Sequence, residues 1–324
     1  MNFYQNKKVL VTGGAGFIGS HLVEALVKKK AKVTVPSLTA NPIFLKAIKN
    51  KIKIVKADLK NQKAANSLTQ NQDLCFHLAA HVGGIHYNNV HPATLLYENL
   101  LPTVNIIEAA KTNHLKRLLI VSSACVYSPQ CSIPTPETEG FLGHPEPTNF
   151  GYGWSKRIAE LLAKTYSEEH QMKIGIVRPY NAYGSRDNFD PKNSHVIPAL
   201  IKRVCDGENP LIVWGDGSPT RSFIYVTDIV RGMLMALDKY PQPDPINLGT
   251  TEEISIKNLS QLIIKLSGKD TKIKFDTTKP NGQPRRNCDT KKAKKILNFT
   301  AVTKLEQGLP KVIKYYQNHV KEKN

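Results

Sequence analysis

Strand-length runs of apolar residues alternate with longer amphipathic stretches through the first 180 positions of the chain. An apolar run at 9–11 is followed by a glycine-rich break, and residues 17–27 then carry apolar side chains at helical spacing. Further strand-length runs lie at 33–35, 52–56, 74–78, 117–122 and 172–177, and the stretch at 92–114 is amphipathic. This alternation predicts an α/β fold with a parallel, doubly wound sheet.

The break after the first apolar run is built of glycines. Gly13, Gly16 and Gly19 stand in a G-x-x-G-x-x-G pattern between the first predicted strand and the first predicted helix. Glycines at this place let a pyrophosphate approach the backbone and the free N–H groups of the helix. Other α/β proteins also carry glycine loops, but the strand before and the helix after supply the context that the motif requires. The chain is therefore predicted to bind a dinucleotide on a Rossmann-type sheet.

The amino-acid composition changes after position 179. Residues 180–220 are rich in Asn, Asp, Gly and Pro, and later short apolar pieces alternate with polar turns. We expect a dinucleotide-binding domain at 1–180, to which a segment near 222–250 returns, and a smaller mixed α/β domain at 181–324 that binds the substrate.

The residues at the ends of the next predicted strands indicate which nicotinamide cofactor the chain can bind. The second strand ends at Ser37 without the acidic residue that bonds the ribose 2′-hydroxyl in NAD-binding versions of the fold. No arginine for a 2′-phosphate stands nearby either, so NAD(H) and NADP(H) both stay open, with a lean to NADP(H). Asp58, after the third strand, could face the adenine or cap a helix. Small residues at Ala79 and Ala80 let a cofactor lie flat across the sheet edge.

Tyr152 and Lys156 stand four residues apart at the start of a predicted helix, so both side chains face the same volume. The ammonium group is expected to lower the pKa of the tyrosine, because a cation favours the phenolate. Such a tyrosine beside a nicotinamide can act as general acid or base on a carbinol proton. Ser123, at the end of the fifth strand, can share the same substrate oxygen. A lone Tyr-x-x-x-Lys is usually a surface pair; the glycine loop and the serine favour catalysis here.

The chain resembles the extended short-chain dehydrogenase/reductase family of nucleotide-sugar enzymes in GGAGFIGSH, HLAA, the serine of VSSACVY, YGWSK and RPYNAYG, which stand in the family's order. The resemblance implies an enzyme with a tightly held nicotinamide cofactor and a C-terminal nucleotide-sugar domain. It also implies Ser123, Tyr152 and Lys156 as the catalytic triad, and homodimers that form through a four-helix bundle including the Tyr152 helix. The implied cofactor contacts are Gly13, Gly16, Phe17, Ile18, Gly19, Asp58, Leu59, Leu78, Ala79, Ala80, Asn99, Tyr152, Lys156, Pro179 and Asn181.

Finer motifs resemble the members that epimerise a GDP-4-keto-6-deoxyhexose at C3 and C5 and then reduce C4 with NADPH. These motifs are HVGGIHYNN, SSACVYS, EPTNFGYGWSK, RDNFDPKNSHVIPAL, VWGDGSPTRSF and KPNGQPRRNCDT. Epimerisation needs a base and an acid on opposite faces of a carbon, and a thiol and an imidazole can fill these roles. The resemblance implies Cys125 and His195 as this pair, in an order that the sequence leaves open. The residues implied to bind substrate are Asn181, His195, Arg203, Trp214, Arg221 and Arg286.

Several of these assignments have competing interpretations. Trp214 could be an ordinary core residue, Arg221 a surface ion pair and Asn181 a turn residue. Ala15 stands where the GDP-sugar enzymes tend to carry an arginine that helps to select NADPH. The alternative function is a redox-neutral nucleotide-sugar epimerase with tightly bound NAD, acting at C3 and C5 of a GDP-sugar or at C4 of a UDP-sugar. A sensor or scaffold that only binds the cofactor is the non-enzyme alternative, but it needs no proton donor such as Tyr152.

The composition of the chain limits the classes of partner that it is expected to bind. The formal net charge is +19, but the lysines are spread from Lys7 to Lys323, which is typical of a solvated surface rather than of a nucleic-acid patch. The five cysteines are scattered and form no C-x-x-C pair, which favours neither a disulfide framework nor a metal site. No apolar run approaches the roughly 20 residues that cross a bilayer, and the N-terminus leads directly into the first strand. We expect a cytoplasmic homodimer that takes a GDP-sugar or another nucleotide-sugar and binds no nucleic acid, membrane or metal.

Overall fold

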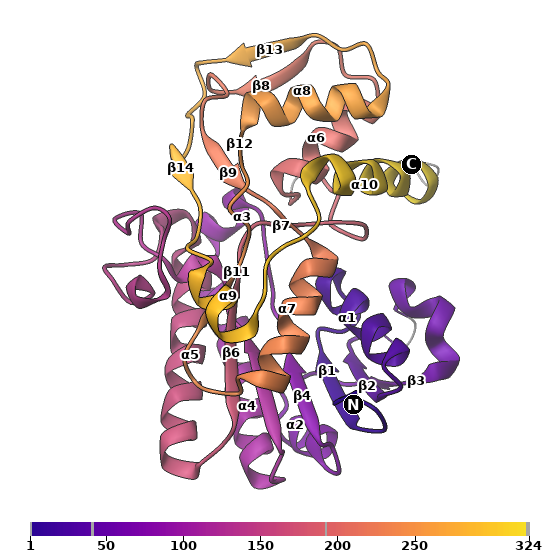
Figure 1. Ribbon diagram of the computed structural model, residues 1–324, viewed down its shortest axis with the longest axis vertical. Coiled ribbons are helices and arrows are strands. Elements are labelled where there is room, and N and C mark those ends of the chain that lie inside the picture. The colour runs from indigo at the N-terminus through magenta and orange to yellow at the C-terminus, as the bar shows by residue number, and fades with distance from the viewer. Residues whose placement is uncertain (1, 40–41, 192, 322–324) are drawn as a thin grey trace.

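The computed structural model describes residues 2–39, 42–191 and 193–321 (Figure 1). Seven parallel strands form the main sheet in the spatial order β11-β6-β5-β4-β1-β2-β3. Their bounds are β1 (Lys8–Thr12), β2 (Lys32–Ser37), β3 (Ile52–Lys56), β4 (Leu74–His77), β5 (Arg117–Val121), β6 (Ile174–Pro179) and β11 (Ile246–Leu248). The strand order reverses between β1 and β4, so the crevice for a ligand lies at the carboxyl ends of these two strands.

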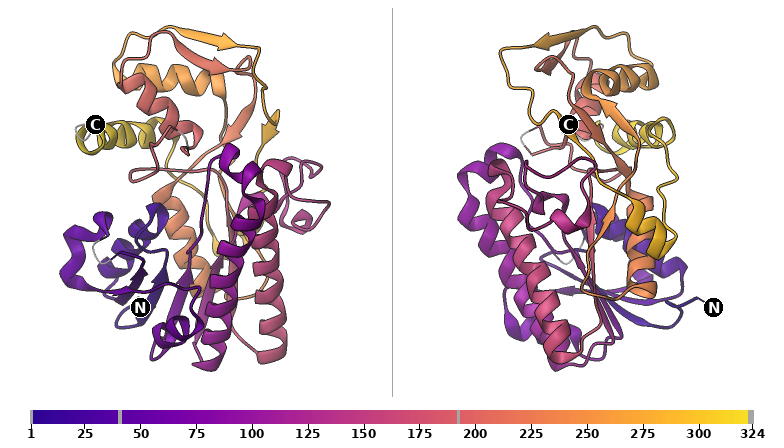
Figure 2. Two further views of the ribbon diagram at one scale, coloured as in Figure 1. Left: turned by 180° about the vertical axis from the view of Figure 1, so that it is seen from behind. Right: turned by 60° about the vertical axis from the view of Figure 1, so that its left-hand side comes forward.

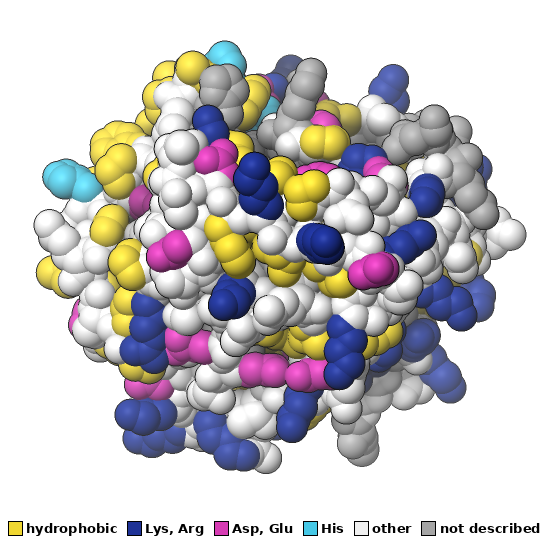
Figure 3. Space-filling model, turned by 90° about the horizontal axis from the view of Figure 1, so that it is seen from above, with side chains coloured by type: hydrophobic (Ala, Val, Ile, Leu, Met, Phe, Trp, Pro, Cys, Tyr) yellow, Lys and Arg dark blue, Asp and Glu magenta, His cyan; other side chains and the backbone are white. Residues whose placement is uncertain are grey.

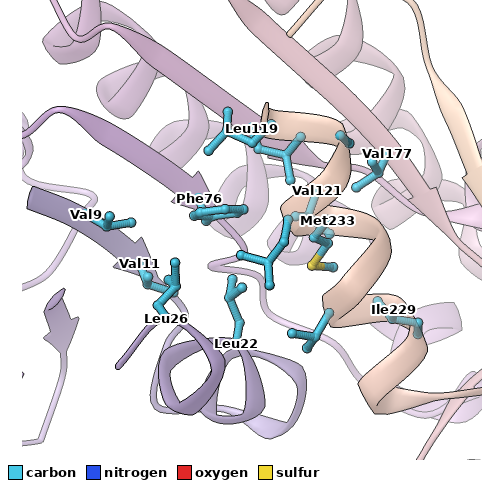
Figure 4. Packing of buried hydrophobic residues seen from close by; sticks show 14 of the residues in the cluster. Val9, Val11, Leu22, Leu26, Phe76, Leu119, Val121, Val177, Ile229 and Met233 are labelled. Atoms are coloured by element: carbon cyan, nitrogen blue, oxygen red, sulfur yellow. The ribbon is translucent and has the colours of Figure 1, made fainter. Parts of the chain in front are cut away.

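Helices cover both faces of this sheet. Their bounds are α1 (Phe17–Lys28), α2 (Gln62–Thr69), α4 (Pro92–Thr112), α5 (Phe150–His170), α7 (Val226–Lys239) and α9 (Lys291–Leu297). Leu119 and Val121 of β5 pack in one core with α1 and α7, where Leu22 and Met233 also lie (Figure 4). The alternate residues of β5 pack in a second core with α2, α4 and α5. Both faces of β5 are therefore buried, which explains its continuous apolar run in the sequence.

The remaining elements form a smaller unit beyond the carboxyl ends of the main strands, in the upper part of Figure 1. Its elements are β7 (Ala182–Tyr183), α6 (Val196–Cys205), β8 (Leu211–Trp214), β9 (Thr220–Ser222), β10 (Ile224–Tyr225), β12 (Glu253–Ser255), α8 (Ile256–Ser267), β13 (Ile273–Asp276), β14 (Arg285–Arg286) and α10 (Leu305–His319). Helices α6, α8 and α10 share one apolar core with β8. Seen from above, the basic side chains on this unit are interspersed with acidic and apolar ones (Figure 3).

Short helices and turns connect some of these elements. They are α3 (Ile85–Val90) and the 3₁₀ turns at Ile43–Lys51, Ala124–Val126, Glu137–Glu139 and Pro147–Asn149. The chain returns from the smaller unit to the main sheet, because β11 pairs with β6 and α7 packs on the sheet behind it (Figure 2).

The predicted doubly wound parallel sheet is confirmed. The structure differs from the prediction in where some strands begin and end. The sixth strand runs to Pro179 rather than ending at 177, because Arg178 and Pro179 also pair with β11. The apolar residues at 223–226 form only the two-residue strand β10, because α7 already begins at Val226.

Candidate active site

The turn between β1 and α1 has the geometry that a pyrophosphate requires. Gly13 has a φ of +67°, and a Cβ there would lie 2.7 Å from the backbone nitrogen of Ala79. A Cβ on Gly19 would lie 2.1 Å from the carbonyl oxygen of Gly13, whereas one on Gly16 would meet nothing closer than 3.4 Å. Two glycines thus allow close packing and the third leaves the outer side of the turn open. No described side chain caps α1, so its first N–H groups can bind an anion.

A buried histidine, which the sequence analysis did not single out, joins this turn to the end of β4. Nδ1 of His77 lies 2.8 Å from the Thr12 hydroxyl, and Nε2 lies 3.0 Å from the Thr103 hydroxyl. Thr103 donates to a carbonyl of its own helix and Thr12 accepts the N–H of Ala79. The ring is therefore neutral, with its proton on Nε2. Burial, and secondly the charge of Lys156, lowers the pKa of His77 to about 3.

The other predicted cofactor residues surround the crevice. Oδ1 of Asp58 accepts a backbone N–H two residues on, and Asn61 caps α2 instead, so the capping interpretation of Asp58 is wrong. The side chain of Asn99 bonds the backbone N–H and C=O of His81, and so holds the segment after β4 in place. The rest lie at the strand ends, just beyond them or in the first turn of α1: Gly13, Gly16, Phe17, Ile18, Gly19, Leu59, Leu78, Ala79, Ala80 and Pro179.

The predicted triad is assembled where β5 ends and α5 begins. Nζ of Lys156 donates to the carbonyl of Val121 at 3.0 Å and lies 5.5 Å from the centroid of the Tyr152 ring. The Tyr152 side chain hydrogen-bonds Ser123, which lowers its pKa, but burial and the neighbouring Cys125 raise the pKa more. Burial also lowers the pKa of Lys156 to about 8.

The expectation that Lys156 depresses the pKa of Tyr152 is therefore wrong for this structure. A phenolate withdrawn from water is disfavoured more strongly than the ammonium can compensate. Tyr152 is a protonated phenol near neutral pH, and a phenol can donate its proton to an oxygen that gains negative charge.

Arg286 lies close to Cys125, and a second arginine, Arg221, lies beside Arg286. Nη2 of Arg286 is 3.9 Å from the sulfur of Cys125, and Nη1 is 3.7 Å from a carboxylate oxygen of Glu146. Arg221 and Arg286 pair in register between β9 and β14, so both side chains point to the same face. Burial, and secondly the charge of Arg286, lowers the pKa of Arg221. Arg221 donates to two backbone carbonyls rather than to a carboxylate. Paired guanidinium groups of this kind suit a diphosphate.

His195 caps the start of α6 and its side chain is 61% exposed. Nδ1 lies 3.7 Å from Oδ1 of Asp187, and this carboxylate raises the pKa of His195. The side chain of Asn193 accepts the N–H of Gly84, which immediately precedes α3. Helix α3 in turn packs against α5, so the His195 segment is tied to the helix of the triad.

The remaining predicted substrate residues have varied surroundings. Trp214 is 65% exposed, with Nζ of Lys279 6.0 Å from its ring centroid, so its interpretation as a core residue is wrong. Arg203 forms a bidentate ion pair with Glu208. The amide nitrogen of Asn181 donates to the carbonyl of Ser222 at 2.8 Å, which links the main sheet to the smaller unit.

The sequence patterns did not predict the buried ion pair that lies next to the triad. Glu160 and Arg178 form a bidentate pair in which both side chains are 2% exposed. Glu160 also accepts the hydroxyl of Ser122, and Arg178 donates to the hydroxyl of Tyr127. The only sequence signal was the spacing, since Glu160 stands one helical turn beyond Lys156.

Some buried polar atoms have no hydrogen-bond partner. Among the described residues, three of the six such atoms lie on the segment between β7 and α6, in Arg186, Asp187 and Ser194. Because an unpaired buried polar atom is unfavourable, these atoms fit a polar ligand. The described part of the chain contains no group of three metal-ligating side chains. None of its helices has both the length and the apolar character for spanning a membrane.

Comparison with known proteins gives consistent results. Residues 9–249 match the model of the NAD dependent epimerase/dehydratase family. The chain is 33% identical to a putative GDP-L-fucose synthase 2 of Arabidopsis thaliana, over 98% of this chain and 94% of that protein. It is 30% identical to a dTDP-4-dehydro-6-deoxy-D-allose reductase of a Streptomyces species, over 98% of each. The structure superposes on a UDP-glucose 4-epimerase of Thermotoga maritima with a TM-score of 0.86 at 26% identity, covering 96% of this chain and 98% of the other.

Proposed function

Because the chain belongs to the NAD dependent epimerase/dehydratase family, we propose that it is a nucleotide-sugar 3,5-epimerase and 4-reductase that acts on a GDP-4-keto-6-deoxyhexose, as a GDP-L-fucose synthase does. The observation that carries this proposal is the place of Cys125, two residues beyond Ser123 and 3.9 Å from Arg286. A reductase or a 4-epimerase needs only a proton donor at the C4 oxygen. A thiol beside that donor supplies the additional base that epimerisation at C3 and C5 requires.

The residues present fit a nicotinamide dinucleotide. The open side of Gly16 and the first turn of α1 would hold the pyrophosphate, and the strand ends at Ala79 and Pro179 would flank the rest. The cofactor, when bound, supplies the hydride that reduces C4. Ser37 offers a hydroxyl at the end of β2, where neither an acidic residue nor an arginine stands. This composition leans to NADP(H) and leaves NAD(H) possible.

Epimerisation is assigned to Cys125 and His195. Arg286 places a positive charge 3.9 Å from the sulfur of Cys125, which supports Cys125 as the base that removes the proton next to the C4 ketone. The enolate oxygen that forms is stabilised by hydrogen bonds from Ser123 and Tyr152. Asp187 favours the imidazolium of His195, which supports His195 as the acid that returns a proton on the opposite face.

Reduction uses the same oxygen. As C4 is reduced, Tyr152 donates its proton to O4, which becomes the hydroxyl. Ser123 polarises the carbonyl beforehand, and Lys156 orients the nicotinamide ribose and stabilises the phenolate that the transfer leaves behind. Arg221 and Arg286 are assigned to the diphosphate, and the exposed ring of Trp214 to the base or sugar.

The first test follows absorbance at 340 nm with NADPH, and separately with NADH, in the presence of GDP-4-keto-6-deoxymannose. We expect steady loss of absorbance, and incorporation of solvent deuterium at C3 and C5 of the sugar. Cys125→Ala is expected to abolish deuterium incorporation, while Cys205→Ala, a buried cysteine of the smaller unit, retains it. Full exchange in Cys125→Ala would overturn the epimerase assignment.

Similarity to the UDP-glucose 4-epimerase and the alanine at position 15 favour one alternative, a redox-neutral epimerase with bound NAD. In that case no absorbance is lost, and NAD is released when the purified protein is denatured. GDP-mannose and UDP-sugars are then the substrates to test.

We further propose that the protein is a homodimer. Apolar side chains at Tyr97 of α4 and at Phe150 and Leu161 of α5 are about half exposed, and these two long helices lie side by side at one edge of the molecule (Figure 2). A second copy would bury them in a four-helix bundle. Light scattering at micromolar concentration should give twice the chain mass, and Leu161→Glu should give the monomer. The five free thiols support our proposal of a reducing, cytoplasmic location.

A further inference from the structure

A buried carboxylate lies directly behind His195. The Asp187 side chain is only 4% exposed, and its Oδ1 accepts the N–H of Asn188 at 2.8 Å and lies 3.7 Å from Nδ1 of His195. Its second oxygen, Oδ2, is buried without a partner. A buried carboxylate needs compensation, and in the described part of the chain His195 is the titratable group placed to provide it.

The segment before Asp187 is anchored to the helix that would bind the cofactor pyrophosphate. Arg186 forms an ion pair with Glu24 of α1 at 2.6 Å, and its φ of +71° turns the chain there. Nε2 of His21, also on α1, lies 2.9 Å from the carbonyl oxygen of Ser185. Asp187 is therefore held by contacts to the main sheet unit, whereas His195 begins α6 of the smaller unit.

We propose that Asp187 is a positioning residue for His195, fixing the imidazole so that Nδ1–H faces the carboxylate and Nε2 faces the substrate carbon. The separation of 3.7 Å is that of an ion pair, and such contacts shorten when a substrate is bound. The proposal rests on the proposed function, in which His195 is the acid. It adds the residue that decides which nitrogen carries the transferred proton.

The proton balance follows from this arrangement. The imidazolium gives the Nε2 proton to the substrate carbon and keeps the Nδ1 proton toward Asp187. The neutral ring regains a proton at Nε2 from water, to which its exposed side chain has access. The carboxylate of Asp187 lies beside Nδ1 and favours the imidazolium form of His195. Asp187 is also the charged group that acts on the pKa of His195.

The test measures the His195 titration directly, by NMR of the imidazole protons, with His195→Gln to assign the signal. Asp187→Asn keeps the shape and removes the charge, and Asp187→Glu restores the charge. We expect Asp187→Asn to lower the pKa of His195 by at least one unit, which reduces the imidazolium fraction about tenfold on the alkaline side. Deuterium incorporation into the sugar should fall by a similar factor at pH 8, with its pH profile shifted down. Asp187→Glu should recover part of both.

Asp228→Asn is the control, because this buried carboxylate at the start of α7 bonds Arg231 and the backbone near Val302 instead. It should leave the His195 titration unchanged. An unchanged titration in Asp187→Asn overturns the proposal, whatever the activity. If His195→Gln still incorporates deuterium fully, His195 is not the acid. In that case Asp187 has no role in the proton transfer either. If His195→Gln loses deuterium exchange but Asp187→Asn leaves the His195 titration unchanged, only the role of Asp187 is overturned and the proposed function stands.

Discussion

Nη2 of Arg286 lies 3.9 Å from the sulfur of Cys125, although 161 positions separate the two residues in the chain. The contact exists because β14 pairs with β9 and carries Arg286 over the end of β5. It gives Cys125 a cationic neighbour, and Cys125 is also the one cysteine that is not buried. A reactive thiolate needs both conditions.

Alkylation should therefore start at Cys125. With limiting iodoacetamide at neutral pH, we expect mass spectrometry to find Cys125 modified first and the other four cysteines unmodified in the folded protein. Arg286→Met should slow the modification by roughly threefold or more, because the positive charge beside the sulfur is lost. Arg285→Met is the matched control, since the neighbouring arginine pairs with Glu253 instead. An equal effect of the two substitutions would contradict the role of Arg286.

Activity should fall on the alkaline side through Lys156. Its pKa is lowered to about 8 by burial, so the ammonium group loses its proton, and its charge, as the pH rises through that value. Tyr152 has a raised pKa and stays a proton donor over the same range. We expect kcat/KM, which reports the free enzyme, to fall tenfold per pH unit above about pH 8. In Lys156→Met, kcat/KM should be low and flat between pH 7 and 9; a retained alkaline limb would assign it to another group.

The fold should lose stability in acid through His77. Its pKa in the folded protein is about 3, below its ordinary value of 6.5, so the unfolded chain binds more protons between these values. Stability contributed by the neutral ring is thus complete above pH 6.5 and decreases as the pH falls. From pH 7 to pH 5 this group alone should lower the free energy of unfolding by about 2 kcal/mol.

Urea unfolding at both pH values checks this. His77→Gln should start less stable at pH 7, because the bonds to Thr12 and Thr103 change, but it should lose about 2 kcal/mol less than the parent on going to pH 5. His114→Asn, at an exposed position with a φ of +51° that asparagine tolerates, should follow the parent. If the parent and His77→Gln lose the same free energy of unfolding between pH 7 and pH 5, protonation of His77 does not destabilise the fold.

Local sequence patterns predicted the features that depend on neighbouring residues. The strand, glycine turn and helix at the N-terminus need no distant partner, so Gly13, Gly16 and Gly19 and the doubly wound sheet could be predicted. Tyr152 and Lys156 share a helix face, and their proximity followed from spacing alone. The assignment of residue roles depended on resemblance to a family, because spacing carries no information on which proton moves.

The features that could not be predicted depend on the assembled fold. The direction of the pKa shift of Tyr152 was wrong because burial, a property of the complete packing, outweighs a neighbouring charge. Trp214 is apolar enough to be a core residue, yet it ends β8, where its side chain is 65% exposed. Arg286 beside Cys125 and Arg178 beside Glu160 join separate elements, and no periodicity encodes such a contact.

The buried pair of Glu160 and Arg178 gives the last prediction. Glu160→Gln leaves the guanidinium buried without its counter-charge, which should destabilise the fold by about 3–5 kcal/mol. Arg178→Met should have a similar effect for the same reason. The double variant removes both charges, so its loss should be smaller than the sum of the two single losses by roughly 2 kcal/mol or more.

Chemical unfolding of the four proteins gives the coupling directly. Glu168→Gln is the control on the same helix, because Glu168 pairs with Lys164 at 3.9 Å where both side chains are mostly exposed, and it should change stability by less than about 1 kcal/mol. Glu160 also accepts the hydroxyl of Ser122, next to Ser123, and stands one turn from Lys156. The double variant should therefore lose less stability than the sum of the two single losses, but it should not retain full activity. If the two single losses simply add, the pair is not coupled, and the support of the triad must come from the packing of α5 alone.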